Sequence, residues 1–257
     1  MPAGYSADIA ADMKTVLPMK KKTPIEIYNA RASQPDFCRL EDTADRFAEI
    51  LIAFEDPLFY SHRGISVPYF FESLSDALKG KGLKGNSTID QQLVKNLYFD
   101  FGRSWIRKLK EAFITLYFTK KLTKKQILEL YYNIIYYDNG QYGIVNASRY
   151  YFSKTPKQLT INQIVFLINT LPIVGIYNPL YHPDDFVRFR NRKMGEIKKY
   201  LDKTSEDIIP EAMKHGAECL DEQLRCVKEE AKKYDNPGPK INERFGPGMP
   251  ESLIADK

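Results

Sequence analysis

A glutamate and an aspartate stand side by side in the run EDPLFYSHRG, where acidic, aromatic, imidazole and glycine residues crowd into a few positions. A helix that ends near Glu55 is predicted by apolar residues at the spacing of one helix face, namely Phe47, Ile50, Leu51 and Phe54. A carboxylate at such a helix end could act as a general base. The alternative is an exposed acidic pair, Glu55 and Asp56, followed by a core histidine, His62. The run by itself favours that second interpretation.

A second polar group lies in the run GNSTIDQQLVKN. We expect Ser87 to cap a helix there, with Asp90 in its first turn, where an acid favours the helix dipole. Hydroxyl, amide and ammonium groups then fall within about two turns and line neighbouring faces. Such a strip would suit a diphosphate, and its members are Thr88, Gln91, Gln92 and Lys95. A solvated helix face is an equal alternative, although such faces more often carry Glu and Lys.

A third group repeats every four residues and therefore shares one helix face. It consists of Arg103, Arg107 and Glu111, with Lys108 and Lys110 at its flanks. Arginine geometry suits phosphate oxygens. A glutamate one turn after an arginine is also an ordinary salt bridge, worth about 0.3 to 0.5 kcal/mol. Taken alone, this group does not indicate a site.

The elements that must position these groups are predicted to be helices. Besides the helices that end near Glu55 and begin at Ser87, we expect one capped by Thr123 and others at about 104–120, 142–151, 160–171, 188–201 and 210–233. The long helix at 104–120 carries apolar residues three or four positions apart: Ile106, Leu109, Phe113 and Leu116. Strand signals are scarce, because the aromatic stretch 134–138 continues a helical pattern before a turn at Asn139 and Gly140. The fold class is therefore mainly α.

Composition excludes several classes of protein. With 257 residues, 43% of them hydrophobic, and a formal charge of +5, the chain is not disordered as a whole. The longest apolar stretch, 164–180, is interrupted by polar and helix-breaking residues, so no membrane-spanning helix is predicted, and the N-terminus does not read as a secretory signal. The mild positive charge favours anionic partners without selecting among them. Three cysteines, Cys38, Cys219 and Cys226, are expected to be structural thiols.

Taken together, these runs resemble the peptidoglycan glycosyltransferases of glycosyltransferase family 51, found alone or as the N-terminal domain of class A penicillin-binding proteins. Five blocks match in order over about 42–194: EDPLFYSHRG, GNSTIDQQLVKN, RKLKE, ILELYYN with YGI and ASRYYF, and LP..G.YNP. The resemblance implies a lysozyme-like glycosyltransferase domain with a small mobile membrane-facing lobe. It also implies a monofunctional enzyme, because no transpeptidase sequence follows. We expect a domain at 42–205, preceded by an extension at 1–41 and followed by a charged helical segment and tail at 206–257.

The resemblance also implies a reaction. Glu55 would take the proton from the 4-hydroxyl of the acceptor GlcNAc as this hydroxyl attacks the anomeric carbon of the donor MurNAc, with inversion. Lys95, Arg103 and Arg107 would stabilise the leaving undecaprenyl diphosphate. Glu111 would orient substrate and basic side chains. The other residues expected to contact substrate are Asp56, Phe59, His62, Thr88, Gln91, Gln92, Asn96 and Lys108. No cofactor is indicated, and the use of a divalent cation is left open.

Partners and localisation follow from the same resemblance. They are lipid II, the growing glycan strand and a membrane surface contacted through the segment 65–85, whose aromatic and lysine residues suit a lipid interface. The expected place is the extracytoplasmic face of the cell membrane, although the N-terminal anchor helix usual in the family is not seen. No nucleic-acid reader motif is present.

Some positions depart from the family pattern. Asp90 stands where a threonine is usual and would add an anion close to the diphosphate path. Glu72 falls near a position that is commonly basic. Phe118 and Thr119 replace the usual Leu-Glu, which we expect to affect packing more than chemistry.

Two other functions remain as alternatives. A peptidoglycan-cleaving lysozyme-like enzyme would also place a glutamate at a helix end, but it has no need of the basic strip. An inactive scaffold that binds lipid II or glycan would keep the cleft without turnover.

Overall fold

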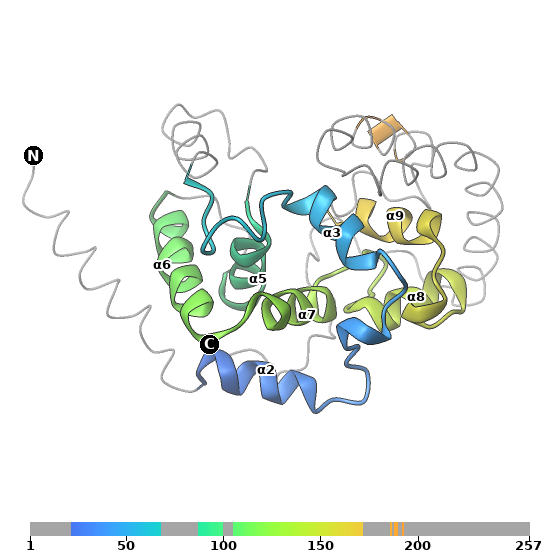
Figure 1. The fold of residues 1–257 in the computed structure, drawn as a ribbon, viewed down its shortest axis with the longest axis horizontal. Coiled ribbons are helices and arrows are strands. Elements are labelled where there is room, and N and C mark those ends of the chain that lie inside the picture. The colour runs from blue at the N-terminus through green and yellow to red at the C-terminus, as the bar shows by residue number, and fades with distance from the viewer. Residues whose placement is uncertain are drawn as a thin grey trace, which may run out of the picture. The chain divides into compact units, whose positions relative to one another are not determined.

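The computed structural model describes residues 22–67, 87–99 and 105–171, together with Phe186, Arg188, Phe189 and Arg192. This part of the chain is built from helices (Figure 1). They are α2 (Pro24–Ala32), η1 (Leu40–Asp42), α3 (Phe47–Glu55), α5 (Ile89–Tyr98), α6 (Trp105–Lys121), α7 (Lys124–Ile134), α8 (Ile144–Phe152), η2 (Pro156–Gln158) and α9 (Ile161–Asn169). Within these residues, β pairing is limited to an isolated bridge between Tyr136 and Tyr142. The predicted mainly α fold is confirmed.

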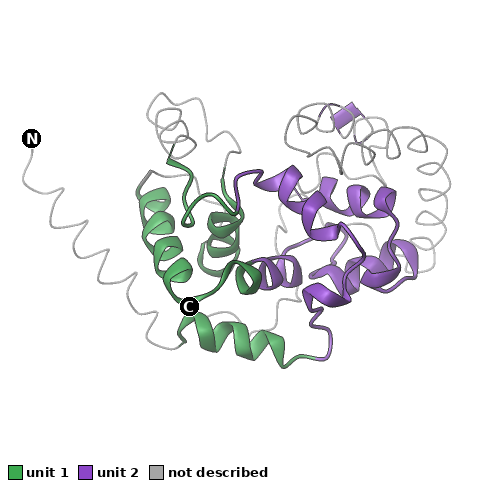
Figure 2. Ribbon diagram, viewed as in Figure 1, with its two compact units in different colours: residues 1–34, 60–127, 250–257 green, residues 35–59, 128–249 purple. Residues whose placement is uncertain are grey.

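The chain divides into two compact units, each described here by itself (Figure 2). Unit 1 consists of residues 1–34, 60–127 and 250–257, and unit 2 of residues 35–59 and 128–249. Helices α2, α5 and α6 belong to unit 1, whereas α3, α8 and α9 belong to unit 2. Helix α7 begins in the first and ends in the second.

Threonines begin several of these helices. Thr88, and not the predicted Ser87, caps α5. Its hydroxyl accepts from the backbone N–H of Gln91, and its own backbone N–H donates to Gln91 Oε1. The predicted cap Thr123 exchanges the same bonds with Gln126 at α7. Thr88 is the cap, and not Ser87, because Gln91 lies three positions after Thr88 and completes a capping box with it. The same signal, with a proline after the cap, begins α2 at Thr23, a helix that we did not predict.

In unit 1, helices α5 and α6 pack against each other. Ile89, Leu93 and Leu97 of α5 are buried in this contact region of unit 1. The rings of Tyr98 and Phe118 meet edge to face, with centroids 5.8 Å apart, so Phe118 has the packing role that was expected of it.

Helix α6 turns the opposite face to the core from the one that its apolar spacing suggests. Phe113 and Leu116 are exposed, and Ile106 and Leu109 are partly exposed. The inner side instead buries a mixed set of side chains: Lys108, Glu111, Ala112, Ile114, Thr115 and Phe118. Periodicity thus predicted the helix correctly and misjudged which side faces the core.

The core of unit 2 forms where α3 packs on α9. The predicted helix face of Phe47, Ile50, Leu51 and Phe54 is buried. Phe47 meets Tyr132 edge to face at a centroid distance of 5.3 Å, and Phe166 meets Tyr151 in the same way at the same distance. This aromatic core packs against the start of α3.

Several expectations fall on residues that are not described. The helices predicted at 188–201 and 210–233 lie there, except for the helical positions 188, 189 and 192. So do Cys219, Cys226 and Glu72. Cys38 is described, and it is a buried free thiol. Burial raises the pKa of this thiol to about 12, with the charges of Asp42 and Glu129 adding to the effect, so it stays protonated and unreactive at neutral pH.

A search of the described helices for a membrane span gives a negative result, because none is both long and apolar enough to cross a bilayer.

Candidate active site

Glu55 is the last residue of α3 and is followed directly by a turn of unit 2. The backbone N–H of Asp56 donates to the carbonyl of Ile52 at 2.8 Å, and that of Phe59 donates to the carbonyl of Asp56 at 2.9 Å. Asp56 and Phe59 are buried, whereas Glu55 is partly exposed. The alternative of an exposed acidic pair is therefore wrong for Asp56. The turn holds the Glu55 backbone at a fixed place and leaves its side chain accessible.

Besides burial, the charge of Glu55 contributes to the raised pKa of two buried tyrosines, Tyr131 and Tyr137. Burial raises the pKa of Tyr131 well above its usual value, and the charges of Glu55 and then of Tyr137 raise it further. Burial does the same for Tyr137, with contributions from Cys38 and Glu55. Both phenols therefore remain neutral at physiological pH. Tyr131 lies in the run ILELYYN, one of the five blocks that match the family pattern.

Gly64 ties the end of the first run to α5 and α6 within unit 1. Its N–H donates to His62 Nδ1 at 3.1 Å, and its carbonyl accepts the Thr88 hydroxyl at 2.6 Å. Its φ of +93° suits glycine, and an added Cβ would lie 2.6 Å from Thr119 Cγ2 and 3.1 Å from Thr115 Cγ2. His62 is partly exposed, which does not fit the alternative of a core histidine.

The polar strip on α5 divides into a buried and a more accessible part. Thr88 and Gln91 are buried in the cap. The Gln91 Nε2 atom is buried too, and no acceptor among the described residues bonds to it. Gln92 and Asn96 are partly exposed, as is Lys95, and the Asn96 amide donates to the Gln92 carbonyl at 2.8 Å. The alternative of a wholly solvated face is therefore wrong for the first turn.

Glu111 is the centre of a buried ionic cluster on α6. Arg107 Nη1 lies 3.1 Å from Glu111 Oε2, and Lys108 Nζ donates to Glu111 Oε1. Lys108 also donates to Ser87 Oγ at 2.9 Å, which links α6 to the start of α5. The exposed fractions of the side chains are 1% for Glu111, 4% for Lys108 and 16% for Arg107. This is not the solvated helix pair that was considered above, because burial makes each charge depend on its partners.

Asp90 is compensated by a cation that the sequence analysis did not single out. Lys124 Nζ lies 2.9 Å and 3.1 Å from the two carboxylate oxygens. The Asp90 side chain is fully buried, and Lys124 is 24% exposed. The anion that Asp90 adds is therefore paired with a lysine inside unit 1. No signal in sequence spacing pairs these residues, because they lie on different helices.

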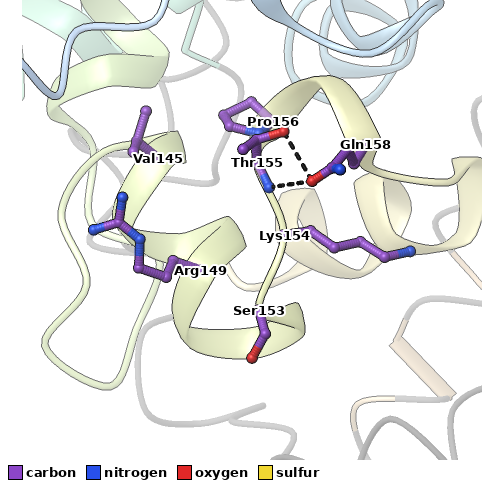
Figure 3. A pocket seen from close by; sticks show the side chains of 7 residues that line it. All are labelled: Val145, Arg149, Ser153, Lys154, Thr155, Pro156 and Gln158. Atoms are coloured by element: carbon purple, nitrogen blue, oxygen red, sulfur yellow. Dashed lines mark hydrogen bonds between the residues drawn. The ribbon is translucent and has the colours of Figure 1, made fainter.

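A small cavity of about 150 Å³ opens in unit 2 around the start of η2 (Figure 3). The hydroxyl and N–H of Thr155 both bond to Gln158 Oε1 at 3.1 Å, and Lys154 Nζ reaches Gln163 Oε1 at 3.2 Å. The polar groups of Lys154, Thr155 and Gln158 are thus bonded to neighbouring residues of unit 2. None of the predicted site residues lines this cavity.

The predicted site residues are distributed over both units. Glu55, Asp56 and Phe59 belong to unit 2. Unit 1 holds His62, Thr88, Gln91, Gln92, Lys95, Asn96, Arg107, Lys108 and Glu111. Within unit 1 the structure brings Thr88 against Gln91, and Arg107 and Lys108 against Glu111. Arg103 lies outside the described residues. Gly64, Ser87 and Lys124 are the supporting residues that sequence reasoning missed.

Comparison with known proteins gives one family and several relatives. The family model described as "Transglycosylase" matches residues 21–198. Penicillin-binding protein 1A of Escherichia coli is 35% identical over 189 residues, which are 70% of this chain and 22% of that protein. Penicillin-binding protein 4 of Bacillus subtilis is 33% identical over 210 residues, 81% of this chain and 32% of the relative.

A shorter relative is similar over more of its own length. The biosynthetic peptidoglycan transglycosylase of Haemophilus influenzae is 38% identical over 149 residues, 56% of this chain and 60% of that protein. The chain thus spans only part of each relative, from about a fifth to three fifths.

Proposed function

Because the chain belongs to the transglycosylase family, glycosyltransferase family 51, we propose that it is a peptidoglycan glycosyltransferase that polymerises lipid II into β-1,4 glycan strands. The observation that carries the proposal is the family match over residues 21–198, which includes all five sequence runs. The transfer inverts the anomeric carbon and releases undecaprenyl diphosphate.

Glu55 is the general base of the proposed reaction. It accepts the proton of the acceptor 4-hydroxyl while that oxygen bonds to the anomeric carbon of the donor. The bond from this carbon to the diphosphate oxygen breaks, and its electron pair leaves with the diphosphate. Partial exposure at the end of a helix held by a buried core supports this role, because a base must reach its proton from a fixed position.

Cations stabilise the leaving diphosphate in this proposal, and they are Lys95, Arg103 and Arg107. Glu111 acts as the positioning residue of Arg107, since it binds Arg107 and Lys108 from the buried side of α6. Charges that are already oriented need no reorganisation when negative charge develops, which makes them effective in catalysis.

Substrate contacts come from the remaining polar residues of the two units. The best supported is Gln91, whose buried Nε2 carries hydrogens that no described acceptor takes, so a substrate oxygen would satisfy it. The same assignment extends to Asp56, Phe59, His62, Thr88, Gln92, Asn96 and Lys108.

The proposed domain is 42–205, with an extension at 1–41 and a charged segment with its tail at 206–257. Helix α2 forms within that extension. Membrane contact is assigned to the segment 65–85, of which residues 65–67 are described and Val67 is 61% exposed. The extracytoplasmic face of the cell membrane is the place where lipid II would be met.

Incubation with labelled lipid II in detergent tests the activity, with and without moenomycin, an inhibitor of this family. We expect a ladder of products that moenomycin blocks and a muramidase digests. Bound lipid II without a ladder would instead favour the inactive scaffold, and cleavage of preformed glycan would favour the lytic enzyme.

Variants test the assigned roles in the same assay. Glu55→Gln should abolish the ladder and keep lipid II binding, whereas Glu49→Gln, on the same helix and paired with Arg46, should leave turnover unchanged. Wild-type turnover by Glu55→Gln would remove this residue as the base. Lys95→Ala and Arg107→Ala should each reduce turnover by about 10²- to 10³-fold, if they act like preorganised donors.

A further inference from the structure

The outer face of α6 exposes an apolar stripe. Phe113, Leu116 and Tyr117 are 59%, 40% and 36% exposed, and their spacing of three and four residues places them side by side on the helix. Ile106 and Leu109 continue the stripe towards the start of α6 and are partly exposed. A helix that packs in a soluble core normally turns its apolar side inward. In α6 the buried side is mixed, with Lys108, Glu111 and Thr115 beside Ala112, Ile114 and Phe118, and an apolar stripe is left on the outer face.

Lysines share this outer face. At 100° per residue, Lys110, Lys120 and Lys121 fall within one quadrant of Phe113. Lys120 and Lys121 are exposed, and no ion pair involving either is found among the residues that the structure describes. Glu111, the one acid in the α6 sequence, lies on the opposite, buried side. The face is therefore apolar and positive, with no acidic residue.

This combination identifies the chemistry of what covers the face. Aromatic and aliphatic groups bordered by lysines are typical of helices that lie in a lipid interface, where the apolar groups enter the acyl boundary and the ammonium groups stay at the headgroups. A protein partner in a folded complex would bring acids to meet the lysines or leave them solvated, whereas anionic headgroups satisfy all of them on one flat surface. The 17 residues of α6 make a helix about 25 Å long, enough to lie along such a surface.

We propose that the outer face of α6, formed by Phe113, Leu116, Tyr117, Lys120 and Lys121, is an interfacial contact that rests on an anionic lipid surface. The contact adds to the one assigned to 65–85 and is independent of catalysis. It holds unit 1 at the membrane by apolar insertion and by charge.

Vesicle binding by the full chain tests this, with phosphatidylcholine vesicles that either contain or lack phosphatidylglycerol, and without any lipid II. The triple variant Phe113→Gln, Leu116→Gln, Tyr117→Gln should bind both kinds of vesicle about tenfold or more weakly, since apolar area no longer enters the interface. The double variant Lys120→Gln, Lys121→Gln should lose about fivefold per lysine on anionic vesicles only.

The matched control is Ile25→Gln on α2, another exposed apolar residue of unit 1, at 39%, which should bind like wild type. Thermal unfolding of each variant checks that the fold is kept. The proposal is overturned if the triple variant binds vesicles as wild type does, as it would if another segment of the chain covered the stripe. A dimer in solution that only the triple variant disperses would overturn it too, because the face would then be an interface between copies.

Discussion

The two units differ in what contacts their buried carboxylates. In unit 1, Asp90 and Glu111 pair with lysine side chains, whereas in unit 2 two buried carboxylates accept hydrogen bonds from backbone N–H groups. In unit 1, Asp90 pairs with Lys124 and Glu111 pairs with Lys108. In unit 2, Glu129 accepts the N–H of Leu40 at 3.0 Å and Asp138 accepts that of Asn139 at 2.9 Å. Glu129 also has an exposed arginine, Arg39, at the longer distance of 3.9 Å.

The difference suits different tasks. An amide holds a carboxylate without bringing a mobile charge, so it fixes a loop. A lysine or arginine that a buried acid orients remains a cation, and a cation in a fixed place can also meet an anionic ligand. The described buried cations, Arg31 and Lys108, both lie in unit 1. We infer that unit 1 is specialised for the diphosphate and unit 2 for holding the proposed base.

Removing one charge from each unit should give the largest contrast. Glu111→Gln leaves buried Lys108 without its carboxylate and should lower the free energy of unfolding by about 3 to 5 kcal/mol. Glu129→Gln keeps an acceptor for Leu40 and should lose only about 1 to 2 kcal/mol. Urea unfolding of both variants measures this. Equal losses would show that the two carboxylates are held in the same way.

Two glycines with positive φ test how tightly each unit is packed. Gly64→Ala should cost about 2 to 5 kcal/mol, because it combines an unfavourable backbone angle with a clash against Thr119 and Thr115. Gly140→Ala in unit 2 has the same angle problem at φ +78° and open space around it, so about 1 to 2 kcal/mol is expected. Urea midpoints compare them. A Gly140 variant as unstable as the Gly64 variant would mean that backbone angle alone sets both costs.

Two tyrosines offer a smaller contrast. The Tyr151 hydroxyl donates to the Tyr137 carbonyl at 2.9 Å and accepts from Asn139 Nδ2 at 2.7 Å, so Tyr151→Phe should destabilise by about 1 to 2 kcal/mol at pH 8. The buried Tyr98 hydroxyl in unit 1 has no hydrogen-bond partner among the described residues. Tyr98→Phe should therefore be neutral or slightly stabilising, as thermal unfolding would reveal. A loss equal to that of Tyr151→Phe would contradict the assignment.

At high pH, the free energies of unfolding of wild type and Tyr151→Phe should become more similar. Burial raises the pKa of Tyr151 well above its usual value. A raised phenol pKa contributes stability that is present below the unfolded-state pKa near 10 and is lost as pH rises above it. As pH rises above about 10, the wild type therefore loses this contribution to its stability. The phenylalanine variant has no hydroxyl at this position and loses nothing. Urea midpoints from pH 8 to pH 11 should converge, and parallel curves would show that Tyr151 does not titrate with unfolding.

Helices and caps were well predicted where the signal is local. The helix face of Phe47, Ile50 and Phe54 and the cap at Thr123 depend only on neighbours within one or two turns. They can therefore be predicted from the sequence alone. Ser87 was misassigned as a cap although Gln91 pointed to Thr88. The helix at Thr23 carried the same signal and was overlooked.

The sequence by itself determined which chemical groups are present, their order along the chain and the helices that carry them, since these depend on residue type and short-range spacing. Only the tertiary structure decided that Asp90 pairs with Lys124, that Glu111 is buried between two cations and that α6 turns its apolar stripe outward. The reason is that burial and ion pairing depend on which helix packs on which, and the energy of a charge changes with its distance from partners and from water.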